Sequence, residues 1–106
     1  MNRVGFVLKV KHGMIEEYKR RHEAVWPEML EALSRHGWHN YSLFLRHDGL
    51  LFGYFEASTS FDDALQGMAG EEVNERWQRH MAPFFEGTGT VADSMMEQLV
   101  EVFHLD

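Results

Sequence analysis

The residues best suited to chemistry lie in one short segment between residues 17 and 28. Tyr18, His22 and Trp26 follow one another at intervals of four residues, and residues four apart lie on the same side of a helix. Histidine carries protons near neutral pH, a tyrosine hydroxyl makes hydrogen bonds, and an indole ring offers a flat apolar wall. A lone histidine on an apolar helix face is more often a packed core residue. The three residues together, followed by Pro27, indicate a pocket for acid–base chemistry.

Such a pocket suits a neutral monosaccharide, because the C–H faces of a sugar pack on aromatic rings while its hydroxyl groups take hydrogen bonds. Two further aromatic residues can reach the same place. Tyr41 opens the second predicted strand, and Trp77 lies on the last predicted helix. Trp77 taken alone fits a place in the core better than one in a pocket.

Other chemistries find little support in the sequence. The chain has no cysteine, which rules out disulfides, thiol catalysis and thiolate metal sites. Its seven histidines include no His-Glu-x-x-His run, so no metal is expected. Gly87-x-Gly89 is not followed by a phosphate-binding fingerprint, and there is no Gly-x-Ser-x-Gly elbow. We therefore expect an activity that needs neither metal nor cofactor.

Length and charge limit the partners. Residues 1–106 form a single domain by size, and a domain of this size buries only about two-thirds of its unfolded surface. A site is therefore shallow or is completed by a second copy of the chain. The net charge of −7 repels phosphate backbones and anionic lipids, and no apolar run approaches the roughly 20 residues of a spanning helix. We expect a cytoplasmic protein with no nucleic-acid or membrane partner.

The periodicity of the first half predicts a strand and then a helix. Apolar residues alternate over residues 4–10, which is typical of a strand with one buried face. Spacings of three and four residues predict a helix over residues 14–36. Pro27 is expected to bend or break this helix near Trp26, and Gly37 to end it.

The rest of the chain predicts a hairpin, two helices and a last strand. Residues 41–46 and 50–57 read as strands joined by an Asp-Gly turn. A cap among residues 58–60 begins a helix that runs to Ala69, and a second helix covers residues 70–85. A loop over residues 86–90 then leads to a strand over residues 98–105. Both faces of that strand are apolar, so it is either interior or covered by a partner.

The order of elements predicts an α+β fold of the ferredoxin-like, split βαβ type. Both helical regions then cover one face of a four-stranded antiparallel sheet, and the other face is bare. The strands carry more apolar side chains than one helical layer can cover, and a large bare apolar face is unusual on a monomer. We therefore expect a homodimer in which two sheets meet face to face.

One run of residues is more specific than packing alone requires. It reads Tyr-x-x-x-His-x-x-x-Trp-Pro-Glu from Tyr18 to Glu28, and the Pro and Glu have no generic reason to accompany the Tyr and His upstream. The accompanying segments are Gly37-x-x-Asn40-Tyr41-Ser42, Leu51-Phe52-Gly53, Arg76-Trp77 with Met81, and Glu101-Val102-Phe103-His104-Leu105. Together these segments resemble the L-rhamnose mutarotase family from the first strand to the C-terminus.

The resemblance implies a dimeric α/β barrel built from two ferredoxin-like subunits. It also implies an isomerase that interconverts the anomers of L-rhamnose or of a closely related 6-deoxy sugar such as L-fucose. His22 matches the family's catalytic proton donor. The positions that match sugar contacts are Tyr18, Tyr41, Trp77 and Gln78. The chain departs from the family where the sugar would be held, with Gln78 in place of a second tryptophan and residues 87–92 in place of an Asn-Pro-rich loop.

Mutarotation opens the sugar ring and recloses it on the other face. The ring oxygen gains a proton while the anomeric hydroxyl loses one, so two proton carriers suffice. His22 is one of them, and Tyr18, Tyr41 or a bound water assists as the other. Two alternatives remain at this point. One is a cofactor-free monooxygenase of the same barrel type acting on a planar phenol, and the other is a non-catalytic sugar-binding or dimerisation module.

Overall fold

A computed structural model describes residues 1–85 and 96–106 of the chain. Its sheet has four strands in the order β2-β3-β1-β4, and each neighbouring pair is antiparallel. The strands are β1 (Asn2–Lys9), β2 (Trp38–Leu45), β3 (Leu50–Ala57) and β4 (Glu97–Gln98). The helices are α1 (Ile15–His22), α2 (Pro27–Arg35), α3 (Phe61–Ala69) and α4 (Glu72–Met81), with 3₁₀ turns η1 (His12–Met14) and η2 (Ala82–Phe84). The predicted α+β, split βαβ arrangement is confirmed.

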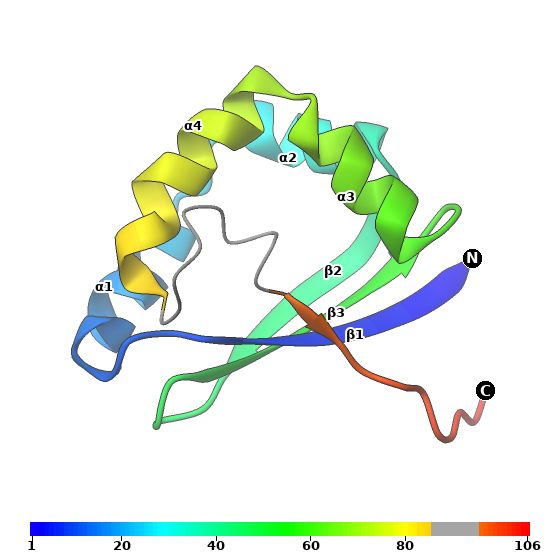
Figure 1. Ribbon diagram of the computed structural model, residues 1–106, viewed down its shortest axis with the longest axis horizontal. Coiled ribbons are helices and arrows are strands. Elements are labelled where there is room, and N and C mark those ends of the chain that lie inside the picture. Colours follow the sequence, from blue (N-terminus) through cyan, green and yellow to red (C-terminus); the bar gives the residue numbers. More distant parts are fainter. Residues whose placement is uncertain (86–95) are drawn as a thin grey trace.

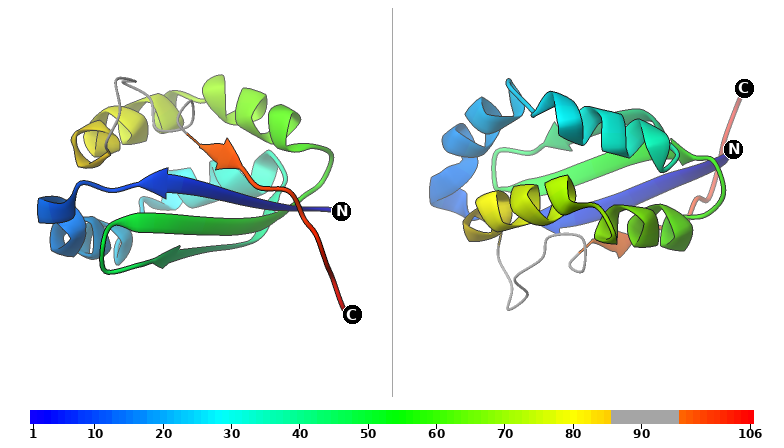
Figure 2. Two further views of the ribbon diagram at one scale, coloured as in Figure 1. Left: turned by 60° about the horizontal axis from the view of Figure 1, so that its bottom comes forward. Right: turned by 90° about the horizontal axis from the view of Figure 1, so that it is seen from above.

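All four helices lie on one face of the sheet, and they form two rows that run in opposite directions across it (Figures 1 and 2). The inward side of β1 carries Val4, Phe6 and Leu8, which are buried as the predicted alternation requires. Phe6 lies at the centre, with its ring parallel to Phe61 of α3 at a centroid distance of 6.0 Å. The core therefore lies between the sheet and the helices.

The first helical region is interrupted immediately before Pro27. Trp26 has an extended backbone with ψ of 134°, and Pro27 begins α2 at a position where its missing N–H costs nothing. α2 ends before Gly37, whose φ of +82° is the left-handed conformation that glycine adopts most easily. The predicted interruption and the predicted end of the helix are both confirmed.

The hairpin is confirmed, although its first strand is longer than predicted. The turn closes through a hydrogen bond from the Gly49 amide to the Arg46 carbonyl at 2.9 Å. β2 begins at Trp38 rather than at Tyr41, because Trp38 already pairs with Ala57 of β3. The alternation was hidden in the sequence by an irregularity in the strand between His39 and Ser42.

The second helical region also follows the prediction in outline. The Ser60 side chain accepts a hydrogen bond from the Asp63 amide at 3.1 Å and caps α3. α4 ends at Met81 rather than near Phe85, because Pro83 follows and cannot donate to the helix ladder. The loop predicted over residues 86–90 lies outside the described residues.

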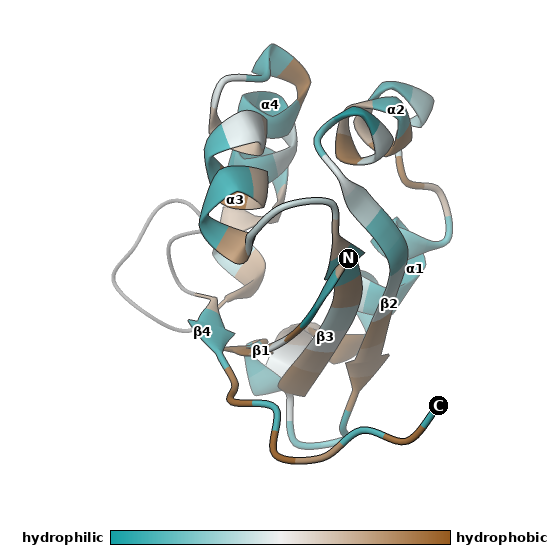
Figure 3. Cartoon of the chain, turned by 90° about the vertical axis from the view of Figure 1, so that its right-hand side faces the viewer, coloured by the Kyte–Doolittle hydropathy of each residue, from teal (hydrophilic) through white to brown (hydrophobic). Residues whose placement is uncertain are grey.

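The last predicted strand is wrong for most of its length. β4 pairs with Phe6 and Val7 of β1, and the Leu99 amide still donates to the Gly5 carbonyl at 2.7 Å. After Leu99 the chain leaves the edge of β1 and runs on the side of the sheet away from the helices (Figure 3). Although β1 continues to Asn2 beside the start of this segment, residues 99–106 form no strand and are exposed, so their apolar alternation does not lead to burial within the chain.

No helix among the described residues is long and apolar enough to cross a membrane.

Candidate functional site

α1 brings Tyr18 and His22 together. The helix has Glu16 and Glu17 in its first turn and basic residues in its last, which suits the helix dipole. Its buried side carries Tyr18, and the four-residue spacing stacks the Tyr18 and His22 rings at a centroid distance of 4.3 Å. The predicted stripe stops there, because the chain turns before Trp26.

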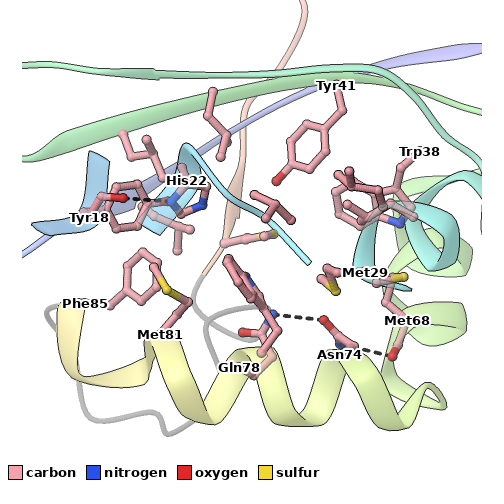
Figure 4. Close-up of a pocket in the computed structure, with 18 residues that line it drawn as sticks. Tyr18, His22, Met29, Trp38, Tyr41, Met68, Asn74, Gln78, Met81 and Phe85 are labelled. Atoms are coloured by element: carbon pink, nitrogen blue, oxygen red, sulfur yellow. Dashed lines mark hydrogen bonds between the residues drawn. The ribbon is translucent and has the colours of Figure 1, made fainter. Parts of the chain in front are cut away.

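One hydrogen bond orients the His22 imidazole. Its Nδ1 lies 3.0 Å from the backbone carbonyl of Tyr18. A carbonyl only accepts, so Nδ1 carries the proton and Nε2 holds the lone pair in the neutral ring. Nε2 lies on the cavity side of the ring (Figure 4). Burial lowers the pKa of His22 below 6.5, and the Tyr18 carbonyl opposes part of that shift. The ring is therefore neutral at pH 7, with a basic nitrogen toward the cavity.

Tyr18 has a different electrostatic character. Its side chain is 5% exposed, and burial raises the pKa of its phenol well above 10 because the ionised form would lose its hydration. The hydroxyl stays protonated across the physiological range. Tyr18 is thus suited to donate a hydrogen bond rather than to act as a base.

Tyr41 enters the cavity from the sheet because of a β-bulge. Trp38 and Tyr41 both line the cavity, although residues three apart in a regular strand point to opposite faces. The register of β2 against β3 shifts between His39 and Ser42, and Asn40 has a φ of +49°. The extra residue rephases the strand, so the Tyr41 hydroxyl points toward the middle of the cavity (Figure 4).

The opposite wall comes from α4. Trp77 is 7% exposed, and its ring meets that of His22 edge to face at 5.7 Å. Trp26 contacts the outer side of Trp77 at a centroid distance of 5.0 Å. Trp77 is therefore both a core residue and a wall of the cavity. Gln78, the next residue along α4, is also 7% exposed and lines the same space.

These side chains enclose a cavity of about 370 Å³, which lies within the size range of small-molecule sites. The described chain thus brings all five predicted site residues together at one cavity. Its lining consists of Leu8, Tyr18, His22, Val25, Met29, Leu30, Leu33, Trp38, Tyr41, Leu43, Leu51, Met68, Asn74, Trp77, Gln78, Met81, Phe85 and Met96. Most of these are apolar, so the polar groups at the cavity are few.

Asn74 is the polar residue that the sequence analysis missed. It is 3% exposed and lies one turn before Gln78 on the buried side of α4. The available signal was its position, because Asn74, Gln78 and Met81 share one helix face. Residue type alone does not indicate that an asparagine is buried, because asparagines in proteins are mostly exposed.

No group of three or more potential ligand side chains in residues 1–85 and 96–106 is arranged to hold a metal ion.

Comparison with known proteins gives one consistent result. A family model described as L-rhamnose mutarotase matches residues 3–105. L-rhamnose mutarotase from Bacillus subtilis is 41% identical over 107 residues, and that from Oceanobacillus iheyensis is 37% identical over 107 residues; each alignment covers all of both chains. A crystal structure of L-rhamnose mutarotase from Formosa agariphila superposes with a TM-score of 0.84 at 27% identity, again over all of both chains.

Proposed function

The chain belongs to the L-rhamnose mutarotase family, and we propose that it interconverts the α and β anomers of L-rhamnose in the cavity beside His22. It is an isomerase that acts on a carbohydrate. The observation that carries the mechanism is the oriented, neutral imidazole of His22 within an aromatic cavity of small-molecule size. The names of the relatives favour this activity over a monooxygenase or a non-catalytic sugar-binding module.

His22 exchanges the proton of the anomeric oxygen. In ring opening, its Nε2 lone pair takes the proton of the anomeric hydroxyl, and the C1–O5 bond breaks to leave an aldehyde. Rotation about the C1–C2 bond turns the other face of the aldehyde toward the C5 oxygen. In ring closure, the imidazolium returns the proton to the aldehyde oxygen. His22 is therefore the proton donor of the closing step.

A second group must serve the ring oxygen, which gains a proton on opening and loses it on closing. The hydroxyl of Tyr41 points into the cavity and can relay this proton directly or through a water. Tyr18 keeps its own proton because burial raises the pKa of its phenol. Its role is then to hold a sugar hydroxyl by a hydrogen bond, while Trp77 packs against the C–H face of the ring.

The activity is tested by magnetisation transfer between the anomeric protons of L-rhamnose, with L-fucose and D-glucose measured beside it. We expect the wild-type chain to accelerate exchange of L-rhamnose. We expect His22→Ala to lower the catalysed rate by roughly 10²- to 10⁴-fold, because a positioned proton carrier contributes about that much. Acceleration of no sugar by the wild type would rule out the mutarotase function, and an unchanged rate in His22→Ala would remove His22 from the mechanism.

We also propose that the chain acts as a homodimer that meets through the open face of the sheet. Phe44 and Phe52 lie on this face, 62% and 38% exposed, with their rings stacked at 6.3 Å. The helices cover the opposite face (Figure 1). Exposed aromatic side chains that form a contiguous patch are unusual unless a partner covers them. A second copy of the chain carries the same patch, so a twofold axis places the two patches against each other.

The C-terminal segment supports the same proposal. Val100, Val102, Phe103 and Leu105 are between 79% and 91% exposed. The segment is held near β1 by the ion pair of Arg3 and Glu101, with Nε and Oε1 2.5 Å apart. Its apolar side chains gain a buried surface when a second copy closes over the sheet, as the dimeric barrel prediction requires.

Three expectations from the sequence stay predictions. They are that residues 1–106 form one domain, that the protein is cytoplasmic, and that it needs no cofactor.

A further inference from the structure

α4 places two amide side chains in a wall that is otherwise apolar. Asn74 and Gln78 are 3% and 7% exposed, and both line the cavity. Amide groups are costly to bury and are retained inside proteins when they are hydrogen-bonded. The neighbouring wall residues Met29, Met68 and Met81 have no such cost.

The hydrogen bonds of this pair have a fixed direction. Asn74 Nδ2 donates to the backbone carbonyl of Met68 at 3.0 Å. Because a carbonyl cannot donate, this bond turns the Asn74 Oδ1 atom toward Gln78, whose Nε2 donates to it at 3.1 Å. The backbone of α3 thus sets the orientation of Asn74, and Asn74 sets that of Gln78 at the cavity (Figure 4).

Stability alone does not account for this arrangement. When both partners of a buried hydrogen bond are replaced by apolar groups of the same shape, stability can be nearly unchanged or even increased. Leucine has the same branching and the same number of side-chain heavy atoms as asparagine, although it is bulkier, and it would extend the apolar wall. The cost of burying two amides is explained if the pair recognises a ligand.

We propose that Asn74 is a positioning residue that holds the Gln78 amide in register with one ring hydroxyl of the sugar, and that the pair determines specificity for that hydroxyl. This proposal rests on the proposed function and extends it to the recognition of one hydroxyl group of the sugar. A site built to hydrogen-bond a substrate hydroxyl discriminates against an analogue that lacks it, because the polar group of the site is then left without its partner.

The experiment measures kcat/KM for anomer exchange with L-rhamnose and with its 2-, 3- and 4-deoxy analogues. The full-length chain is compared with Gln78→Leu, Asn74→Leu and the double variant. Gln66→Leu is the matched control, since Gln66 is exposed on α3 away from the cavity. Asn74→Ala, which adds no bulk, is measured beside Asn74→Leu, and circular dichroism establishes that each variant is folded.

We expect the wild type and Gln66→Leu to discriminate against one deoxy analogue by about 10- to 100-fold. Gln78→Leu should abolish this discrimination for that analogue alone. Both Asn74 variants should weaken it, and Asn74→Leu should have no further effect on it in the Gln78→Leu background.

Two results separate the possible failures. If Asn74→Leu and Gln78→Leu lower kcat/KM equally for every sugar, the amide pair is structural and the specificity proposal is wrong. If the wild type does not accelerate the exchange of L-rhamnose at all, the proposed function itself fails.

Discussion

At the scale of single residues, the chemistry depends on the state of one imidazole. The Tyr18 carbonyl fixes the His22 tautomer, and burial keeps the ring neutral. The first effect comes from the i, i+4 spacing of α1, and the burial comes largely from the sheet and α4. A proton carrier that is neutral at pH 7 acts first as a base.

This state predicts the pH dependence of the catalysed rate. The pKa of His22 is lowered below 6.5 in the folded chain, so the basic form dominates above that pH. We expect the rate, after subtraction of the uncatalysed exchange, to be nearly constant from pH 6.5 to 8 and to fall as the pH is lowered through this pKa. The His22 pKa is measured independently from the NMR shift of its Cε1 proton. A catalysed rate that rises on acidification would mean that His22 acts first as an acid.

Folding stability should depend on pH in the same direction as the catalysed rate. The unfolded state binds a proton at His22 more readily than the folded state does, because the folded pKa is the lower one. The contribution of His22 to stability is therefore present above pH 6.5 and is lost as the pH falls through the folded pKa.

Asn40 controls where Tyr41 points. Asn40 holds a left-handed backbone, and its Nδ2 donates to Glu56 Oε2 at 3.0 Å. We expect Asn40→Gly to keep the bulge, whereas Asn40→Val should destabilise the fold by about 1–2 kcal/mol and lower kcat/KM, since a β-branched residue disfavours a positive φ. Urea unfolding and anomer exchange measure the two effects. Ser42→Val is the control in the same strand, and equal behaviour of the Gly and Val variants would contradict the bulge argument.

At the scale of elements, the central strands meet through a close contact of aromatic ring and backbone. Phe6 of β1 pairs with Gly53 of β3, and a Cβ atom at Gly53 would lie 2.2 Å from the tip of the Phe6 ring. The absence of a side chain at Gly53 allows Phe6 to lie flat over the sheet and fill the core beneath α3. The packing of β1 against β3 and α3 therefore depends on Gly53.

We expect Gly53→Ala to destabilise the chain by about 1–3 kcal/mol, because the added methyl must displace the Phe6 ring in a packed core. Gly13→Ala is the matched control, since a Cβ atom there meets nothing within 4 Å. The midpoints of urea unfolding compare the two. A Gly53→Ala variant as stable as Gly13→Ala would show that Phe6 repacks freely.

At the scale of the whole molecule, the helices cover one face of the sheet (Figure 1), and the stacked, exposed rings of Phe44 and Phe52 belong to the other. The C-terminal segment leaves the sheet edge and extends along the same open side (Figure 3). Both features expose apolar area that the described residues of one copy do not bury.

The homodimer proposal predicts a molar mass of about twice the 12.4 kDa of one chain in light scattering coupled to size exclusion. The double variant Phe44→Lys, Phe52→Lys should reduce the mass to that of one chain, because four buried charges would face one another across the twofold axis. Leu30→Lys, a like change at an exposed position of α2, should leave the mass unchanged. A wild-type chain that elutes as a monomer would overturn the proposal.

The sequence by itself determined what depends on near neighbours. The spacing of Tyr18 and His22 dictated that their rings share a helix face, Pro27 dictated the break between α1 and α2, and the Asp-Gly turn dictated the hairpin. These features follow from backbone geometry over four or five residues, so the sequence pattern within a short window predicts them.

The tertiary structure decided what depends on contacts between distant segments. The bulge at Asn40 exists in the register of β2 against β3, and the polar role of Asn74 appears once the Met68 carbonyl lies beside it. The alternation of residues 98–105 predicts a strand, yet pairing with β1 ends with Gln98 and the Leu99 amide, and the residues that follow are exposed. Periodicity reports which side chains favour burial, and the assembled fold decides what is there to cover them.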